Sequence, residues 1–216
     1  MLYIIITGAS RGFGRALAID LASKCPQPVH FLLSSGPQSK NLLHNTLEEI
    51  INVRRGIPFD TKVDSVTADL SDLDSLSAST SILLKDFEGL SFADNVLYIN
   101  NAGSLGTLAG VGTEPLANDV KPFSDAYNLN VTASSYITSE VLRRYKGKVC
   151  RLTLVNISSL AASQPINSWA LYCSGKAARE MFYRCIALEN EGMDDCVVRV
   201  LNYCPGTINM ALLHDI

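Results

Sequence analysis

The sequence predicts a single α/β domain built on a doubly wound parallel sheet with helices on both faces. Two observations support this fold class. Short apolar segments alternate with helix-like stretches along the chain, and the first segment runs directly into a glycine-rich turn. Short apolar runs are typical of parallel strands buried on both faces, and their alternation with helices implies right-handed crossover connections. The six predicted strands are 2–6, 29–34, 62–67, 95–100, 151–157 and 197–202.

In chain order, the first strand is the apolar, β-branched run LYIII, and the glycine turn and first helix follow it. The other five strands are equally short and apolar. The predicted helices lie between them, at 15–23, 39–53, 72–87, 122–145 and 169–189. The Gly- and Pro-containing stretch 103–120 is predicted to be a loop, either an idle surface loop or one that lines a substrate site.

Length and charge exclude several classes of protein. The chain has 216 residues, of which 47% are hydrophobic, so it can bury one core. Its net charge is −3 and it has no basic run, so we expect no nucleic-acid partner. The first apolar run is broken by Gly8 and Arg11, so it is too short to span a bilayer. It also lacks the positively charged residues with which a signal peptide begins. We therefore expect a cytoplasmic protein without a membrane partner.

The cysteines show no metal-binding pattern. No CxxC pair or His-linked spacing occurs among them, so we expect free thiols in a reducing compartment and no metal. The six are Cys25, Cys150, Cys173, Cys185, Cys196 and Cys204.

The turn Thr7-Gly8-Ala9-Ser10-Arg11-Gly12-Phe13-Gly14 has the features of a nucleotide site. Gly8 permits the tight turn, Gly12 lets the backbone approach a pyrophosphate, and Gly14 lets the helix pack closely. The helix N-terminus offers amide donors and a positive dipole end to phosphates. A merely flexible turn is the alternative, but the preceding N-terminal strand favours the nucleotide site.

Tyr172 and Lys176 stand four residues apart in a predicted helix, so they share one face. A nearby ammonium favours the phenolate and would lower the pKa of the tyrosine from its usual value of ~10. The pair thus indicates an acid–base catalyst. The alternative is an amphipathic helix with one side chain buried and the other reaching solvent.

These segments resemble the short-chain dehydrogenase/reductase family. The resemblance rests on TGASRGFG, on NNAG at 100–103, on Ser159-x12-Tyr172-x3-Lys176 and on Pro205-Gly206, and it extends to about residue 210. Within the family, the chain is most similar to the sepiapterin reductase branch, through NNAGSLG (100–106), VNISSLAASQP (155–165), SWALYCSGKAARE (168–180) and VRVLNYCPG (198–206). The resemblance implies a Rossmann-type fold.

The resemblance implies four catalytic residues. Tyr172 would donate a proton to a substrate carbonyl oxygen, and Ser159, selected over Ser158 by its offset from the tyrosine, would hydrogen-bond the same oxygen. Lys176 would lower the pKa of Tyr172 and bind the nicotinamide ribose. Asn130 would hold a water that resupplies the proton; otherwise it is a solvent-facing or helix-bending residue.

The resemblance also implies an NADP(H) site. No acidic residue ends the second strand at Ser34-Ser35-Gly36, which disfavours NAD, and Arg11 resembles the basic residue of NADPH-preferring members. Gly36 stands where a second arginine is expected, and Ser35 or Lys40 would compensate. The expected cofactor-binding residues are Gly8, Ser10, Arg11, Gly12, Phe13, Gly14, Asp69, Leu70, Asn101, Ala102, Gly103, Tyr172, Lys176, Pro205 and Gly206. Outside the resemblance, Asp69-Leu70 is an ordinary helix N-cap region, and the Asn-Ala-Gly turn of residues 101–103 is purely structural.

The expected substrate is a small carbonyl compound, most simply a pterin with a carbonyl side chain, bound by Ser159, Trp169 and Tyr172. Trp169 is otherwise a core aromatic. A general carbonyl or hydroxysteroid-type reductase and a truncated, silent nucleotide-binding form remain alternatives. Family members usually continue past Pro205-Gly206 into a further helix and a seventh strand, so we expect a C-terminally short single domain, 1–216, lacking that strand. The resemblance further implies a homodimer formed through helices 122–145 and 169–189.

Overall fold

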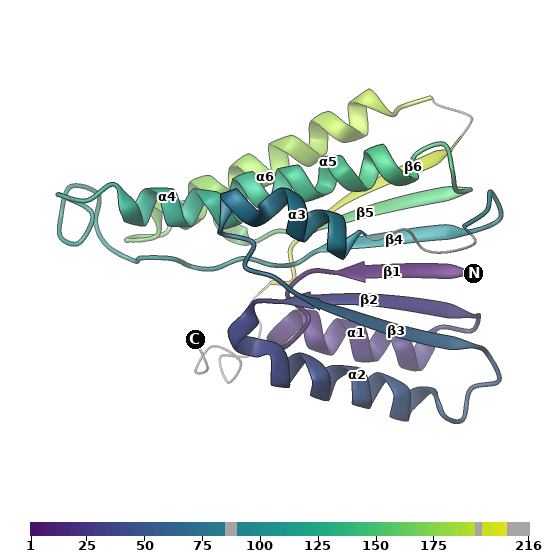
Figure 1. The fold of residues 1–216 in the computed structure, drawn as a ribbon. Coiled ribbons are helices and arrows are strands. Elements are labelled where there is room, and N and C mark those ends of the chain that lie inside the picture. The colour runs from purple at the N-terminus through teal and green to yellow at the C-terminus, as the bar shows by residue number, and fades with distance from the viewer. Residues whose placement is uncertain (85–89, 193–195, 207–216) are drawn as a thin grey trace.

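A computed structural model, which describes residues 1–84, 90–192 and 196–206, contains a six-stranded sheet (Figure 1). The strand order is β3-β2-β1-β4-β5-β6, and every neighbouring pair is parallel. The predicted doubly wound parallel sheet is therefore confirmed. The strands are β1 Leu2–Ile6, β2 Val29–Ser35, β3 Thr61–Thr67, β4 Asn95–Asn100, β5 Arg151–Ile157 and β6 Val197–Tyr203.

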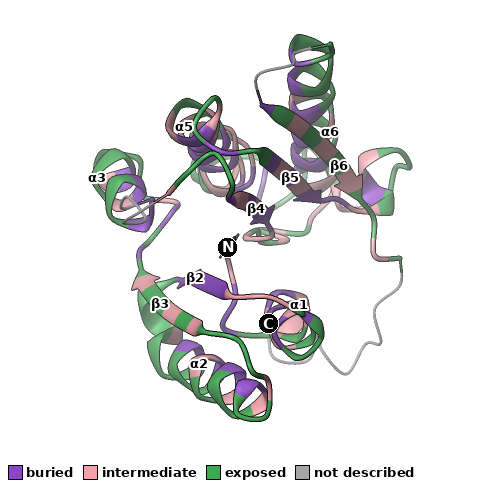
Figure 2. Cartoon of the chain, turned by 90° about the vertical axis from the view of Figure 1, so that its right-hand side faces the viewer, coloured by how far each residue is buried: buried purple, intermediate pink, exposed green. Residues whose placement is uncertain are grey.

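Helices cover both faces of the sheet (Figures 1 and 2). One face carries α1 (Gly12–Lys24) and α2 (Lys40–Arg54). The other carries α3 (Leu73–Leu83), α5 (Ser134–Tyr145) and α6 (Ala170–Glu189). A further helix, α4 (Lys121–Tyr127), extends beyond the carboxyl ends of the strands, and short 3₁₀ turns occupy Pro37–Ser39 and Leu160–Ala162.

The central strand β1 divides the core into two layers. Successive side chains of a strand point to opposite faces of the sheet. Tyr3 and Ile5 accordingly join the cluster under α3, α5 and α6, whereas Ile4 and Ile6 join the cluster under α1 and α2. The three isoleucines are fully buried. An apolar run without alternation is thus what a central strand covered on both faces requires.

Helix α1 begins at Gly12, three residues before its predicted start, and two other differences from the predicted helices are larger. The stretch 122–145 is interrupted by a π-helical turn, Asn128–Ala133, between α4 and α5. We attribute this turn to Asn130, whose side chain forms the hydrogen bonds described below. Insertion of such a bonded residue widens one turn of an α-helix into a π-helical turn. The predicted helix 72–87 ends at Leu83, and residues 85–87 lie outside the described part of the chain. The stretch 103–120 is a loop, as predicted, in which turns and bends occur only over residues 111–120.

Surface and thiol features add three observations. Within the described residues, no helix is both long and apolar enough to cross a membrane. All six cysteines are free thiols. Among residues 1–84, 90–192 and 196–206, no three His, Cys, Asp or Glu side chains gather as metal ligands would.

Candidate active site

The candidate site lies where β1 and β4 adjoin. The chain continues from these two central strands toward opposite edges of the sheet, and in doubly wound sheets the ligand-binding crevice lies at the carboxyl ends of such strands. The loops after the two strands are cross-linked. Thr7 Oγ1 accepts hydrogen bonds from the backbone N–H groups of Asn101 (3.1 Å) and Ala102 (3.0 Å). In return, Asn101 Nδ2 donates to the carbonyl oxygens of Thr7 (3.0 Å) and Gly8 (2.9 Å). These four hydrogen bonds therefore hold the loop after β1 against the loop after β4.

The backbone geometry explains why glycine occupies three positions of the turn. Gly8 and Gly12 have φ values of +69° and +56°, in the left-handed region that glycine tolerates without penalty. A Cβ at Gly14 would overlap the carbonyl oxygen of Gly8 and the amide nitrogen of Asn101. A Cβ at Gly12, in contrast, would meet no atom within 4 Å, so the backbone there faces open space.

This turn fits the pyrophosphate of a dinucleotide. Helix α1 begins at Gly12, and the first backbone N–H groups of a helix lack partners within it. They lie beside the open space at Gly12, where an anion can accept their hydrogen bonds. Of the other predicted residues of this turn, Ser10 is buried, Arg11 is exposed and Phe13 stacks on Tyr203 at the end of β6, with 6.1 Å between ring centroids.

Ser159, Tyr172 and Lys176 come together at the end of β5 and the start of α6. Ser159 caps the 3₁₀ turn after β5, with Oγ accepting from the N–H of Ala161 at 3.2 Å, and its side chain hydrogen-bonds Tyr172. Lys176 Nζ lies 5.5 Å from the centroid of the Tyr172 ring. The edge of the Trp169 ring packs on the same tyrosine at 5.7 Å between centroids.

The two neighbouring serines have different partners. The hydroxyl of Ser158 is buried and donates to Glu180 Oε1 at 3.0 Å. Ser159 is half-buried and bonds Tyr172. Ser159, not Ser158, is thus the serine beside Tyr172, and its catalytic role stays a prediction.

The pKa of Tyr172 corrects one expectation. Burial raises it above its ordinary value of 10.0, and the opposing effects of the Ser159 hydrogen bond and the Arg179 charge do not reverse the shift. Lys176 does not lower it as predicted, because this lysine is only 4% exposed and its own pKa is well below the ordinary value, through burial first and Arg179 second. Burial thus disfavours the charged form of both side chains.

Asn130 lies in the π-helical turn and is 1% exposed. Its Nδ2 donates to the carbonyl oxygen of Ser104 at 2.8 Å, and its Oδ1 accepts from the N–H of Ser104 at 3.0 Å. Asn130 is thus neither solvent-facing nor simply helical; it clamps the loop that follows Gly103. Its predicted role in holding a relay water stays a prediction.

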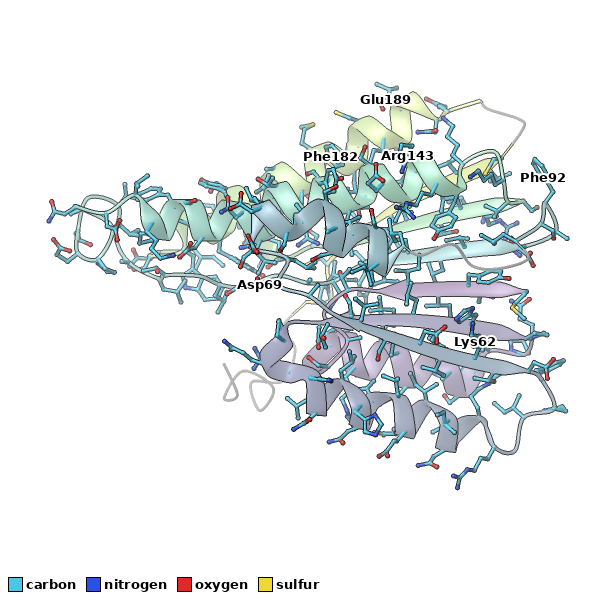
Figure 3. The ribbon with its side chains drawn as sticks, in the orientation of Figure 1. Lys62, Asp69, Phe92, Arg143, Phe182 and Glu189 are labelled. Carbon is cyan, nitrogen blue, oxygen red and sulfur yellow. The ribbon has the colours of Figure 1, made fainter. Side chains whose placement is uncertain are left out.

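The remaining predicted cofactor residues lie around the crevice or near it. Figure 3 shows Asp69 beyond the carboxyl end of β3, opposite the end at which Lys62 stands. Asp69 Oδ1 accepts from the N–H and hydroxyl of Ser71, a local turn, and Leu70 is buried in the core. Pro205-Gly206 follow β6 after one residue, Cys204.

Two buried polar residues of the site escaped the sequence analysis. One is Thr7, described above. The other is Arg179, which is fully buried on α6. Its guanidinium donates to Asn100 O at 2.8 Å, to Ala102 O at 2.9 Å and to Asn156 Oδ1 at 3.0 Å. A signal was present, because Arg179 follows Lys176 by three positions and so shares its helix face.

The comparisons with known proteins agree with this architecture. The chain belongs to the short-chain dehydrogenase family, whose model matches residues 2–216. Sepiapterin reductase of Xenopus tropicalis is 36% identical over 206 residues, which are 95% of this chain and 73% of that protein. Benzil reductase ((S)-benzoin forming) of Bacillus subtilis (strain 168) is 28% identical over 207 residues, 95% of this chain and 74% of that protein.

A solved structure shows the same fold. The short-chain dehydrogenase from Sphingobium yanoikuyae in complex with NADPH superposes with a TM-score of 0.73 at 22% identity, covering 97% of this chain and 72% of that one. The protein is therefore an oxidoreductase of the short-chain dehydrogenase family.

Proposed function

We propose that this protein is an NADPH-dependent reductase of the side-chain carbonyl of a pterin, acting as sepiapterin reductases do in tetrahydrobiopterin synthesis. The observation that carries the proposal is the gathering of Ser159, Tyr172 and Lys176 beside the crevice. The 36% identity to the Xenopus tropicalis enzyme supports the pterin substrate over other carbonyl compounds.

NADPH, when bound, supplies a hydride to the carbonyl carbon. Tyr172 donates its phenolic proton to the carbonyl oxygen as negative charge grows there, and Ser159 hydrogen-bonds the same oxygen. The raised pKa of Tyr172 suits this direction of the reaction, because it keeps the phenol protonated at neutral pH. After turnover Lys176 takes up a proton from solvent and passes it to the Tyr172 phenolate, and its lowered pKa makes its ammonium a stronger acid for that step.

The preference for NADPH over NADH rests on charge. Strand β2 ends in Ser34 and Ser35 and is followed by Gly36, so no carboxylate there would repel a 2′-phosphate. Ser35 is buried, and its hydroxyl donates to the carbonyl oxygen of Gly36. We assign the pairing with the phosphate to two exposed cationic side chains, Arg11 and Lys40.

A general carbonyl reductase is the second candidate, supported by the similarity to the benzil reductase of Bacillus subtilis. The half-buried Trp169 beside Tyr172 would suit any flat aromatic ketone. A silent nucleotide-binding protein is the third.

The deciding experiment measures the rate of NADPH oxidation by the purified chain with sepiapterin, benzil or a steroid ketone as the substrate. Each measurement is repeated with NADH in place of NADPH. We expect the highest kcat/KM with sepiapterin and NADPH. A higher kcat/KM with benzil or the steroid would support the general reductase instead. NADPH binding without turnover of any of the three would support the silent form.

We further propose a cytoplasmic homodimer, on the family resemblance. Its interface would use the outer faces of α4, α5 and α6, where Met181 and Leu188 of α6 are exposed. Sedimentation equilibrium at micromolar concentration would give twice the chain mass of 23.4 kDa. A single-chain mass would contradict the dimer.

A further inference from the structure

We propose that Arg179 is a positioning residue: its guanidinium fixes the turn after β4, which borders the cofactor crevice, against the helix that carries Tyr172 and Lys176. This inference rests on the proposed function, because it assigns a role within the same site.

The contacts of Arg179 join three elements. The residue belongs to α6, and its side chain is 0% exposed. Two of its donors reach the carbonyl oxygens of Asn100 and Ala102, at the carboxyl end of β4, and the third reaches Asn156 Oδ1 on β5. A planar fork with several donors holds such a set of acceptors in one geometry, which an ammonium cannot do.

The same turn is bonded to the glycine turn on its other side. Asn101 donates to the carbonyl oxygens of Thr7 and Gly8, as described above. A continuous series of hydrogen bonds therefore runs from α6 through Arg179 and the turn after β4 to Gly8. This series of hydrogen bonds sets the position of the proton donor relative to the bound cofactor. The rate of hydride and proton transfer depends steeply on that relative position.

The positive charge of Arg179 indicates that this residue does more than fill space in the core. Among the described residues, no carboxylate forms an ion pair with it; its acceptors are two carbonyl oxygens and one side-chain amide. A buried cation without a counter-ion is costly, so a neutral side chain would serve better if only space had to be filled.

That charge also acts on the catalytic pair. It favours the phenolate of Tyr172 and the neutral amine of Lys176, and thereby lowers the pKa of both groups. Four other titratable groups act on these side chains or on Arg179 from α6, β4 and the segment after β6: Cys173, Tyr183, Tyr98 and Cys204.

The chain contains a matched control. Arg54 on α2 is also buried, at 4% exposure, and also donates to backbone carbonyl oxygens, but it ties α2 to α1 and its following loop, away from the crevice. Its backbone acceptors are Ala22 O at 3.3 Å, Cys25 O at 2.6 Å and Gln27 O at 3.1 Å. Replacing Arg54 tests what losing a buried carbonyl-binding arginine does to stability alone.

The experiment compares Arg179→Lys with Arg54→Lys. NADPH binding is measured by quenching of Trp169, the one tryptophan of the chain, and kcat/KM is measured across pH. Arg179→Lys should weaken NADPH binding and lower kcat about 100-fold, because the cofactor and the proton donor lose their alignment. Arg54→Lys should lower the unfolding midpoint and leave NADPH binding and kcat unchanged.

A second variant, Asn156→Asp, keeps an acceptor for Arg179 Nε and adds a counter-charge, at the loss of the Nδ2 bond to Asn202 Oδ1. It should move the alkaline limb of the pH profile upward, because the field on Tyr172 is neutralised. This variant decides the question if Arg179→Lys does not fold.

Two results would overturn the inference alone: wild-type NADPH binding and kcat in Arg179→Lys, or an unshifted pH profile in Asn156→Asp. A wild-type chain that neither binds NADPH nor reduces a carbonyl would overturn the proposed function first, and this inference with it.

Discussion

The ammonium group of Lys176 donates a 2.8 Å hydrogen bond to the carbonyl oxygen of Ile157, the last residue of β5. This bond holds the lysine under the Tyr172 ring, in an environment that lowers its pKa through burial and the nearby Arg179 charge. In the proposed function, this buried lysine serves catalysis at the expense of stability.

Lys176→Met tests that trade-off. Turnover should fall by about 100-fold or more, since proton return to Tyr172 is lost. The free energy of unfolding at pH 7 should not fall, because the apolar side chain removes the cost of burying a cation.

The pH dependence of stability has a definite sign. Between the lowered folded-state pKa of Lys176 and its ordinary value of 10.5, the unfolded chain binds more protons than the folded chain, so stability rises with pH through that window. Urea unfolding of wild type at pH 7, 8 and 9 should show this rise relative to Lys176→Met. Parallel curves for the two proteins would contradict the lowered pKa.

Gly14→Ala should destabilise the fold and abolish cofactor binding. The new Cβ would overlap the carbonyl oxygen of Gly8 and the amide of Asn101, and overpacking of this kind costs about 1–3 kcal/mol. Gly36→Ala is the control, since a Cβ there meets no atom within 4 Å and its φ is negative. Equal unfolding midpoints for the two variants would show that the close approach at Gly14 is unimportant.

Asn130→Ala should lower stability and weaken NADPH binding together. The substitution removes both side-chain bonds to the backbone of Ser104, which is exposed, so each lost bond costs only its net contribution of about 0.5–1.5 kcal/mol. Denaturant melts and Trp169 quenching measure the two effects. A variant with wild-type stability and binding but a lower kcat would instead indicate that Asn130 acts only in proton relay.

Arg11→Ala should raise the Kd for NADPH by about ten-fold or more and leave that for NADH nearly unchanged, because one charge-assisted bond to the 2′-phosphate is lost. Arg15→Ala is the matched control, since that arginine pairs with Glu49 on the surface. Equal losses of NADPH and NADH binding in Arg11→Ala would remove Arg11 from cofactor discrimination.

The inner strands β1, β2, β4 and β5 could be predicted because a strand covered on both faces is largely apolar, whereas the exposed edge strands β3 and β6 could be placed by the alternation of elements. All observed limits differ from the predicted ones by at most one residue. The π-helical turn could not be predicted, because Asn130 is bonded to Ser104, a residue 26 positions earlier.

The site could be predicted only in part, because several of its contacts join residues that are far apart in the sequence. The spacing of Tyr172 and Lys176 places them on one helix face, but spacing carries no information on burial, which raises the pKa of the tyrosine. The role of Arg179 depends on the carbonyl oxygens of Ala102 and Asn100, which precede it by 77 and 79 positions. Only the fold brings those partners together.

Tyr172→Phe tests the central claim most directly. It removes the hydroxyl and keeps the ring that packs against Trp169. The rate of NADPH-dependent carbonyl reduction should fall by about 100- to 10,000-fold while the Kd for NADPH is unchanged, because only the proton donor is lost. A variant that retains the wild-type rate would show that Tyr172 is not the proton donor.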